Sequence, residues 1–257
     1  MDGKNKISVV INTYNAERFL QQVLDTAKGF DEILICDMES TDRTIEIARQ
    51  NGCKIVTFEK KNYHSAEPAR TFAIQSASSQ WVLVVDADEL IPSELREYLY
   101  NEIKKPDCPS GIYIPRKNYY AGKFMHCYYP DYLLRFFIKE GTEWPPYVHT
   151  FPTVKGRLDK IARNRKDLAF IHLADEKTNV ILNKTNEYTE NEIEKKKGKN
   201  YSFFALFYRP FFRFFKAYIL KGGYRDGMAG FVRASFDGLY QFIMLIKIWE
   251  SKQSRKQ

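Results

Sequence analysis

Two carboxylates, Asp86 and Asp88, follow directly on the apolar run of residues 81–85. A D-x-D pair at the end of a buried strand can hold a divalent cation, because hard oxygen ligands suit Mg²⁺ or Mn²⁺. Such a metal could neutralise the oxygens of a diphosphate. The structural alternative is that Asp88 and Glu89 favour the positive end of a helix that begins after Pro92. The motif alone leaves both readings open, and we predict Glu89 to be a helix-start residue.

Asp37 and Arg70 could serve the same ligand. Asp37 follows another apolar run, and a carboxylate there could accept a hydrogen bond from a base or a ribose. Arg70 falls on a predicted helix that leads into the D-x-D strand, where a guanidinium could grip phosphate oxygens with two N–H groups. The alternatives are a salt bridge for Arg70, and a helix cap at Ser40 or Thr41 for the residues after Asp37.

The elements that must position these residues alternate between strand length and helix period. The predicted strands are residues 7–11, 32–36, 54–58 and 81–85. The predicted helices are residues 16–28, 41–51, 66–77 and 92–103. This alternation implies an α/β fold with a mostly parallel sheet covered by helices on both faces. Ligands of such sheets bind at the carboxyl ends of the strands, so the polar residues there should converge on one crevice.

The second half of the chain has a different pattern. Residues 111–172 are β-like and rich in aromatics and prolines, which favours an acceptor-side half of the same domain. Residues 184–200 are predicted to be a polar helix or linker. The expected organisation is a domain over residues 1–190, with halves 1–115 and 116–190, and a helical tail over residues 191–257.

The positive charge of the chain is concentrated in this tail. Residues 201–257 contain ten Lys or Arg against three acidic residues, a net +7 of the protein's formal +8. Ten of the eighteen residues 201–218 are Phe or Tyr, interleaved with Arg209, Arg213 and Lys216. Such a segment suits an anionic membrane surface, with rings in the bilayer and cations at the headgroups. The alternatives are a packed core helix and a nucleic-acid-binding tail. Because nucleic acid binding leaves the D-x-D pair unexplained, we expect no nucleic acid partner.

Several protein classes are disfavoured by what the sequence lacks. It has no G-x-G-x-x-G and no G-x-x-x-x-G-K-[ST], which disfavours dinucleotide oxidoreductases and P-loop enzymes. The sequence contains no uncharged run of 18 residues that would predict a membrane-spanning helix. Its amino terminus does not resemble a secretory signal. The four cysteines show no zinc-like spacing and are expected to be reduced thiols. We therefore expect a cytoplasmic location.

Three motifs, SVVINTYNAERFL, ILICDMESTDRTIEIA and EPARTFAIQSASSQWVLVVDADE, resemble the nucleotide-sugar half of inverting family 2 glycosyltransferases with the GT-A fold. The resemblance implies a Rossmann-like GT-A sheet, a nucleoside-diphosphate sugar donor, expected to be UDP-linked, and a divalent metal, Mg²⁺ or Mn²⁺. It also implies roles for individual residues: Thr13, Tyr14 and Asp37 around the base and ribose, Arg70 at the diphosphate, and Asp86 with Asp88 at the metal and donor sugar.

The second half is similar to bacterial enzymes that add sugars to the lipopolysaccharide core. The similar segments include YYPDYLLRFF, YVHTFPTVKG and YILKGGYRDGMAGF. The resemblance implies a lipid-linked or lipopolysaccharide-type saccharide acceptor, and an enzyme peripheral to the inner face of the cytoplasmic membrane.

One position departs from this pattern. Those enzymes usually carry His-Glu where this chain has His149-Thr150, and the acidic residue corresponds to the expected catalytic base. Inversion requires a base that removes the acceptor proton, and a threonine cannot do so. We expect His149, Glu143 or Asp131 to act instead, with His149 ranked first for its pKa range. The alternative is a catalytically weakened, membrane-bound homologue.

Overall fold

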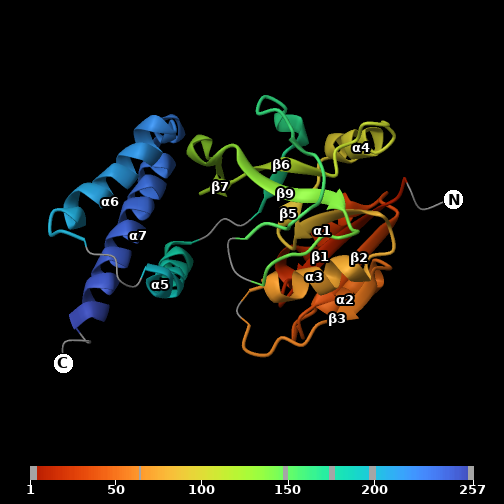
Figure 1. Cartoon of the computed structure of the whole chain (residues 1–257), viewed down its shortest axis with the longest axis horizontal. Helices are drawn as coiled ribbons and strands as arrows, with labels where there is room; N and C mark the ends of the chain where they lie inside the picture. Colours follow the sequence, from red (N-terminus) through yellow and green to blue (C-terminus); the bar gives the residue numbers. More distant parts are fainter. Residues whose placement is uncertain (1–4, 64, 147–149, 174–176, 197–200, 254–257) are drawn as a thin grey trace. The chain divides into compact units, whose positions relative to one another are not determined.

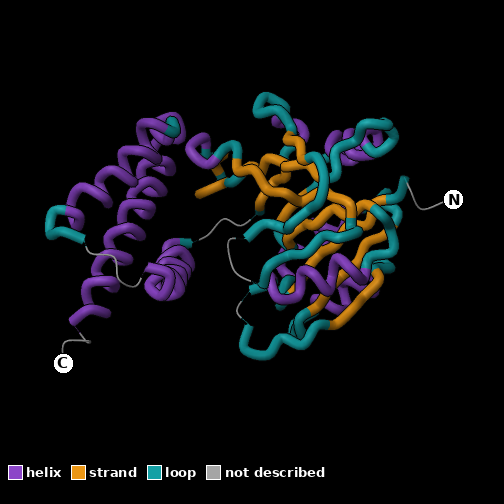
Figure 2. The backbone as a smooth tube through the Cα atoms, in the orientation of Figure 1, coloured by secondary structure: helices purple, strands orange, loops and turns teal. Residues whose placement is uncertain are grey.

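The chain folds into two compact units (Figure 1). The computed structural model describes residues 5–63, 65–146, 150–173, 177–196 and 201–253. The first unit comprises residues 1–117 and 130–173, and the second comprises residues 118–129 and 174–257. Figure 2 shows that strands and helices mix in the first unit, whereas helices dominate the second. The second unit thus draws on two separate stretches of the sequence.

The first unit is built on a nine-stranded sheet of order β3-β2-β1-β4-β9-β6-β11-β5, with β10 paired to β6. Its strands are β1 Ile7–Thr13, β2 Glu32–Asp37, β3 Lys54–Thr57, β4 Trp81–Asp86, β5 Glu89–Leu90, β6 Gly111–Lys117, β9 Asp131–Ile138, β10 Leu158–Lys160 and β11 Phe170–His172. Its helices are α1 Glu17–Ala27, α2 Thr44–Gln50, α3 Glu67–Ser76, α4 Ser93–Glu102 and the 3₁₀ turn η2 Lys166–Leu168. β1 to β4 run parallel, and β9 is antiparallel to both of its neighbours.

The eight amino-terminal elements match the predicted strands and helices closely. Each predicted element is present, and the largest shift is at α2, which begins at Thr44 rather than at residue 41. β1 is buried along its whole length because a central strand of a covered sheet has no solvent face. Strand order reverses between β1 and β4, so the carboxyl ends of these two strands flank the point where ligands of open α/β sheets bind.

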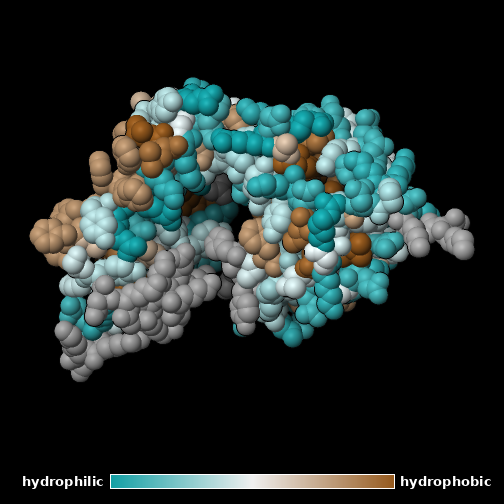
Figure 3. All heavy atoms as spheres, turned by 45° about the horizontal axis from the view of Figure 1, so that its top comes forward, coloured by the Kyte–Doolittle hydropathy of each residue, from teal (hydrophilic) through white to brown (hydrophobic). Residues whose placement is uncertain are grey.

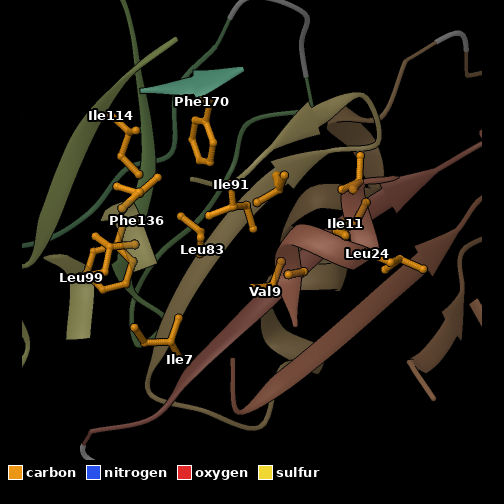
Figure 4. Packing of buried hydrophobic residues seen from close by; sticks show 14 of the residues in the cluster. Ile7, Val9, Ile11, Leu24, Leu83, Ile91, Leu99, Ile114, Phe136 and Phe170 are labelled. Atoms are coloured by element: carbon orange, nitrogen blue, oxygen red, sulfur yellow. The ribbon is translucent and has the colours of Figure 1, made fainter. Parts of the chain in front are cut away.

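The core of the first unit lies on both faces of the sheet. Successive strand residues point to opposite faces, so Val9 and Ile11 join one apolar cluster and Val10 joins the other. The first cluster includes side chains from α1, α2 and α4, and the second includes side chains from α3. Figure 4 shows Phe136, Leu83 and Ile91 in the first cluster. The sheet is therefore held rigidly beneath its polar strand ends.

The second unit is a helical assembly around one long helix. Its elements are the hairpin strands β7 Tyr119–Tyr120 and β8 Lys123–Phe124, the 3₁₀ turns η1 His126–Tyr128 and η4 Gly223–Asp226, the π-helical turn η3 Lys216–Leu220, and the helices α5 Thr178–Lys196, α6 Ala205–Phe215 and α7 Gly227–Gln253. The predicted boundary at residue 190 falls inside α5, which packs against α7 in this unit. Among the described helices, none is both long and apolar enough to cross a membrane.

Close backbone contact holds the turn between α6 and α7. A Cβ added to Gly230 would lie 1.9 Å from the carbonyl oxygen of Gly223, so only glycine fits there. In the same region the Asp226 carboxylate accepts a hydrogen bond from the backbone N–H of His126 at 2.8 Å and contacts the His126 ring. These contacts tie the hairpin insertion of residues 118–129 to the start of α7.

Candidate donor-binding site

The pairing register brings the predicted donor residues to one edge of the sheet. Thr13 of β1 lies opposite Asp37 of β2, and Asn12 of β1 lies opposite Asp86 of β4. Because neighbouring strands lie about 4.8 Å apart, the two aspartates flank β1 at a separation of about 10 Å. The buried side chain of Asn12, between them, has no hydrogen-bond partner among the described residues. This edge therefore combines two carboxylates with an unused amide.

Asp37 is buried and tied to its neighbours by hydrogen bonds. Its carboxylate accepts bonds from the hydroxyl of Thr13 at 2.8 Å, and from the backbone N–H and hydroxyl of Ser40 at 2.8 and 2.6 Å. The prediction of Ser40 or Thr41 as a helix cap is wrong, because α2 begins at Thr44 and Ser40 binds Asp37 instead. A carboxylate can accept about four hydrogen bonds, so Asp37 keeps room for one more.

The loop after β1 is fastened to the loop after β2. The backbone N–H of Asn15 donates to the Ser40 hydroxyl at 2.9 Å, and the Asn15 side-chain oxygen accepts from the Thr41 backbone N–H at 2.8 Å. Asn15 adopts a left-handed φ of 49°, a conformation that asparagine tolerates better than most residues. Its neighbour Tyr14 is 47% exposed, with the Lys60 ammonium 4.4 Å from the ring centroid. The loops thus hold an aromatic ring in solvent beside Asp37.

Asp86 ends β4 among three arginines. Arg70 of α3 donates a hydrogen bond to one carboxylate oxygen at 2.8 Å, and Arg135 of β9 donates to the other. The Arg116 guanidinium lies 4.0 Å from the second oxygen. Burial alone would raise the pKa of Asp86, but the charges of Arg135 and Arg70 outweigh it and hold this pKa far below its usual range. Asp86 therefore stays ionised.

Arg116 extends the ion pairs to two further carboxylates. It donates to Glu89 at 2.9 Å and to Asp131 at 3.0 and 2.7 Å. Burial would lower the pKa of Arg116, yet the charges of Glu89 and Asp131 raise it above its usual range. The predicted helix start at Glu89 is wrong: the residue lies in β5, is fully buried, and accepts the backbone N–H of Asp86 at 3.0 Å. The Glu89 carboxylate therefore pairs with Arg116 inside the site instead of stabilising a helix start.

Six side chains form a network without net charge, three of them buried and three partly exposed. It consists of the carboxylates Asp86, Glu89 and Asp131 and the guanidinium groups Arg70, Arg116 and Arg135. Buried charges persist only where they are paired and hydrogen-bonded, which explains the matched numbers. Arg70 nevertheless keeps Nε and Nη1 without a hydrogen-bond partner in the described part of the chain, so Asp86 does not use up its donors.

Trp144 covers the two arginines that bind Asp86. The guanidinium carbons of Arg70 and Arg135 lie 4.6 and 5.5 Å from the centroid of its ring. The Trp144 backbone exchanges hydrogen bonds with the Thr71 hydroxyl at 2.9 and 3.0 Å, which fixes the indole over α3. Cation–π contacts of this kind are stronger when water is excluded. Trp144 thus holds the guanidinium groups in place.

Asp88 stands apart from the network, beside a histidine. The His172 Nε2 lies 3.3 Å from an oxygen of Asp88, and the two side chains are 21% and 33% exposed. β11 brings them together: His172 pairs with Glu89, and the Leu173 backbone N–H donates to the Asp88 carbonyl at 2.7 Å. Carboxylate oxygen suits Mg²⁺ or Mn²⁺ sites that also use water and phosphate oxygens, whereas imidazole nitrogen suits transition metals better than Mg²⁺. Among the described residues, no cluster of three or more potential metal ligands occurs.

The three predicted base residues have different environments. Asp131 is engaged by Arg116, while Glu143 is exposed and its backbone pairs with that of Thr153. The Thr150 hydroxyl donates to the Pro145 carbonyl at 3.1 Å. His149 lies outside the described residues.

Sequence reasoning missed Arg116, Arg135, Trp144 and His172. Arg135 lies in the segment YYPDYLLRFF, whereas Arg116 follows Pro115 in β6 and Trp144 precedes Pro145. An arginine inside the apolar strand YLLRFF requires a buried carboxylate as its partner, and this signal was available. His172 carried no comparable signal, because its partner Asp88 is distant in the sequence.

The fold places the chain among proteins with the GT-A fold. A mannosyltransferase from Pyrobaculum calidifontis, solved with GDP-Man and Mn²⁺, superposes with a TM-score of 0.57 at 14% identity, covering 96% of this chain and 88% of that one. This likeness confirms the predicted α/β fold.

The chain belongs to glycosyl transferase family 2, whose sequence pattern matches residues 8–238. It is 24% identical over 262 residues to LpsC of Rhizobium meliloti, a lipopolysaccharide core biosynthesis glycosyltransferase, covering 97% of this chain and 94% of that protein. It is 26% identical over 266 residues to an uncharacterised glycosyltransferase of Rickettsia typhi, covering 95% and 87% of the two chains. The predicted resemblance is therefore confirmed at the level of the family.

Proposed function

We propose that this chain transfers a sugar, with inversion, from a UDP-sugar to a lipid-linked or lipopolysaccharide-type saccharide. One observation carries the proposal: Asp37, Arg70 and Asp88 lie around the same sheet edge, which is formed by the carboxyl ends of β1 and β4. The name of LpsC as a lipopolysaccharide core enzyme supports the acceptor class. The GDP-Man and Mn²⁺ complex of the archaeal mannosyltransferase supports a nucleotide-sugar donor and a divalent metal.

The nucleoside part of the donor would bind between the loops after β1 and β2. Tyr14 offers an exposed ring face for a base, and base–aromatic stacking is worth about 1 to 3 kcal/mol. Asp37 can accept one hydrogen bond from a ribose hydroxyl or a base N–H, while Thr13 holds its carboxylate. These three residues give the donor its orientation.

The diphosphate would bind between Arg70 and a metal held by Asp88 and His172. Arg70 supplies unused N–H donors, and its position is fixed by Asp86 and Trp144. We assign the metal to Asp88 and His172 because the Asp86 oxygens already accept bonds from arginines. When bound, Mg²⁺ or Mn²⁺ would neutralise charge that develops on the leaving diphosphate. Asp86 then serves the site by holding Arg70 in place.

An inverting transfer also requires a base that removes the proton from the attacking acceptor hydroxyl. Glu143 is exposed and could reach an acceptor, whereas Asp131 accepts two hydrogen bonds from Arg116 on one of its oxygens. We retain His149 as the first candidate base and Glu143 as the second. Thr150, which replaces the expected acid, favours one alternative function: a weakened homologue that binds donor but transfers sugar slowly.

A lipid-linked acceptor also favours a particular location of the protein in the cell. We place the protein in the cytoplasm, peripheral to the inner face of the cytoplasmic membrane, where a lipid-linked acceptor and an anionic surface are both present. The basic, aromatic tail supports this placement.

A thermal-shift series tests the proposal. UDP-, GDP- and ADP-sugars are added with and without Mn²⁺ to the wild-type chain and to Asp88→Asn. We expect a UDP-sugar with Mn²⁺ at 100 times its Kd to raise Tm by about 5 to 10 °C, and Asp88→Asn to lose the dependence on Mn²⁺. If no nucleotide sugar shifted Tm, the transferase proposal would fail. Donor binding without measurable sugar release would support the weakened homologue.

A further inference from the structure

One side of α6 exposes a continuous row of rings. The aromatic face consists of Phe204, Phe207, Tyr208, Phe211, Phe212 and Phe215. These side chains are between 37% and 75% exposed. Their spacing of three and four residues places them on one side of a helix. Ile219 and Leu220 of η3 extend the apolar surface, and Figure 3 shows apolar side chains gathered over the second unit. Patches of this kind mark interaction sites.

The opposite side of α6 is already used inside the second unit. Ala205 is buried, and a Cβ added to Gly238 of α7 would lie 3.1 Å from the carbonyl oxygen of Pro210. α6 and α7 therefore approach closely along this side. Packing among the described residues of this unit therefore leaves the aromatic face open to a partner.

The surface beside the aromatic face is positively charged. Arg209, Arg213 and Lys216 follow one another at helical spacing, and residues 201–225 contain no acidic residue. The next acid along the chain, Asp226, is buried against His126, and Asp237 of α7 offsets part of the charge of Arg213. An apolar stripe bordered by cations is the pattern of a helix that lies in a membrane interface.

We propose that α6 lies in the headgroup region of an anionic bilayer, with the aromatic face toward the acyl chains and Arg209, Arg213 and Lys216 at lipid phosphates. A second copy of the chain is a less suitable partner for the aromatic face than a bilayer. In a symmetric dimer the positive charges beside the two aromatic faces would lie close together and repel. A spanning arrangement is excluded for the described helices by their length and apolarity. The proposal specifies the surface for the membrane partner named above and does not rest on sugar transfer.

Flotation of the full chain with vesicles tests the proposal. We expect the chain to float with phosphatidylcholine vesicles that contain phosphatidylglycerol, and to remain unbound with phosphatidylcholine alone or in high salt, which screens the charges. Phe207→Ser and Phe211→Ser should each weaken binding about tenfold. Arg213→Gln and Lys216→Gln should each weaken it about fivefold.

Matched control variants distinguish binding through the aromatic face from nonspecific binding to vesicles. Phe242→Ser changes an exposed ring on α7, and Lys104→Gln removes an exposed charge from the first unit; neither should change binding. Folding of every variant is checked by its Tm. A second readout compares the quenching of Phe211→Trp and Phe242→Trp by brominated lipids with that of the wild type, whose three tryptophans give the background, and we expect additional quenching only from position 211.

Four results would overturn the proposal. The first is that the chain does not bind anionic vesicles, and the second is that it binds neutral vesicles equally well. The third is that the Phe207→Ser/Phe211→Ser double variant binds like the wild type. The fourth is that the chain binds vesicles only weakly and an oligonucleotide abolishes this binding. A wild-type dimer that the double variant converts to a monomer would assign the face to a second copy. Vesicle binding without donor binding would leave this inference standing while the proposed transfer reaction failed.

Discussion

The Arg70 guanidinium donates a 2.8 Å hydrogen bond to the Asp86 carboxylate, although Arg70 belongs to α3 and Asp86 ends β4. Arg135 of β9 donates to the same carboxylate, so one aspartate joins three elements of the first unit. Removing one partner from a buried ion pair leaves the other charges uncompensated. Within the D-x-D motif, Asp86 is therefore held by two arginines, whereas Asp88 lies beside His172.

Asp86→Asn should lower the free energy of unfolding by about 3 kcal/mol, because Arg70 and Arg135 lose their counter-charge in a buried place. Urea denaturation at pH 7 measures the change. The control is Asp25→Asn, which removes the exposed partner of Lys28 and should leave stability unchanged. A variant as stable as the wild type would show that Asp86 contributes nothing to the fold.

The same carboxylate predicts an acid-sensitive stability. The pKa of Asp86 is lowered in the folded state from an unfolded value near 3.8, so its stabilisation is complete above that value. It is lost as pH falls below 3.8 towards the folded pKa. The difference in unfolding free energy between wild type and Asp86→Asn should therefore be constant from pH 7 to about pH 5 and shrink at lower pH. Urea denaturation at several pH values would contradict this if the difference grew on acidification.

Tyr14→Ala should weaken donor binding about tenfold, because an exposed base-stacking ring is lost while Asp37 and Thr13 remain. Tyr14→Phe should bind like the wild type, since stacking does not use the hydroxyl. Isothermal titration with UDP measures both variants, and Tyr63→Ala, another exposed tyrosine, is the control. Equal affinity for Tyr14→Ala and wild type would remove Tyr14 from the site.

Much of this arrangement could be predicted from the sequence, because its signals are local. Apolar runs of strand length and helix period located the first eight elements, and a parallel sheet then required its polar strand ends to converge. The pairing of Asp88 with His172 could not be predicted, since it depends on β11 returning beside β5 from a distant part of the chain. Glu89 was misassigned for the same reason: its partner Arg116 lies on β6, and only the folded sheet shows that the carboxylate is buried.

Thr150 stands at the position where the resemblance to lipopolysaccharide core enzymes implies the acid that activates the acceptor. If the chain is a weakened transferase, Thr150→Glu should raise kcat by about 100-fold, within the range that a positioned base contributes. Thr150→Gln, of similar size but unable to accept a proton, should not. If His149 or Glu143 already serves as the base, Thr150→Glu should leave kcat unchanged and Glu143→Gln or His149→Ala should lower it. The pH profile of kcat then distinguishes a histidine base from a carboxylate base, because an imidazolium loses its proton at a higher pH than a carboxyl group does.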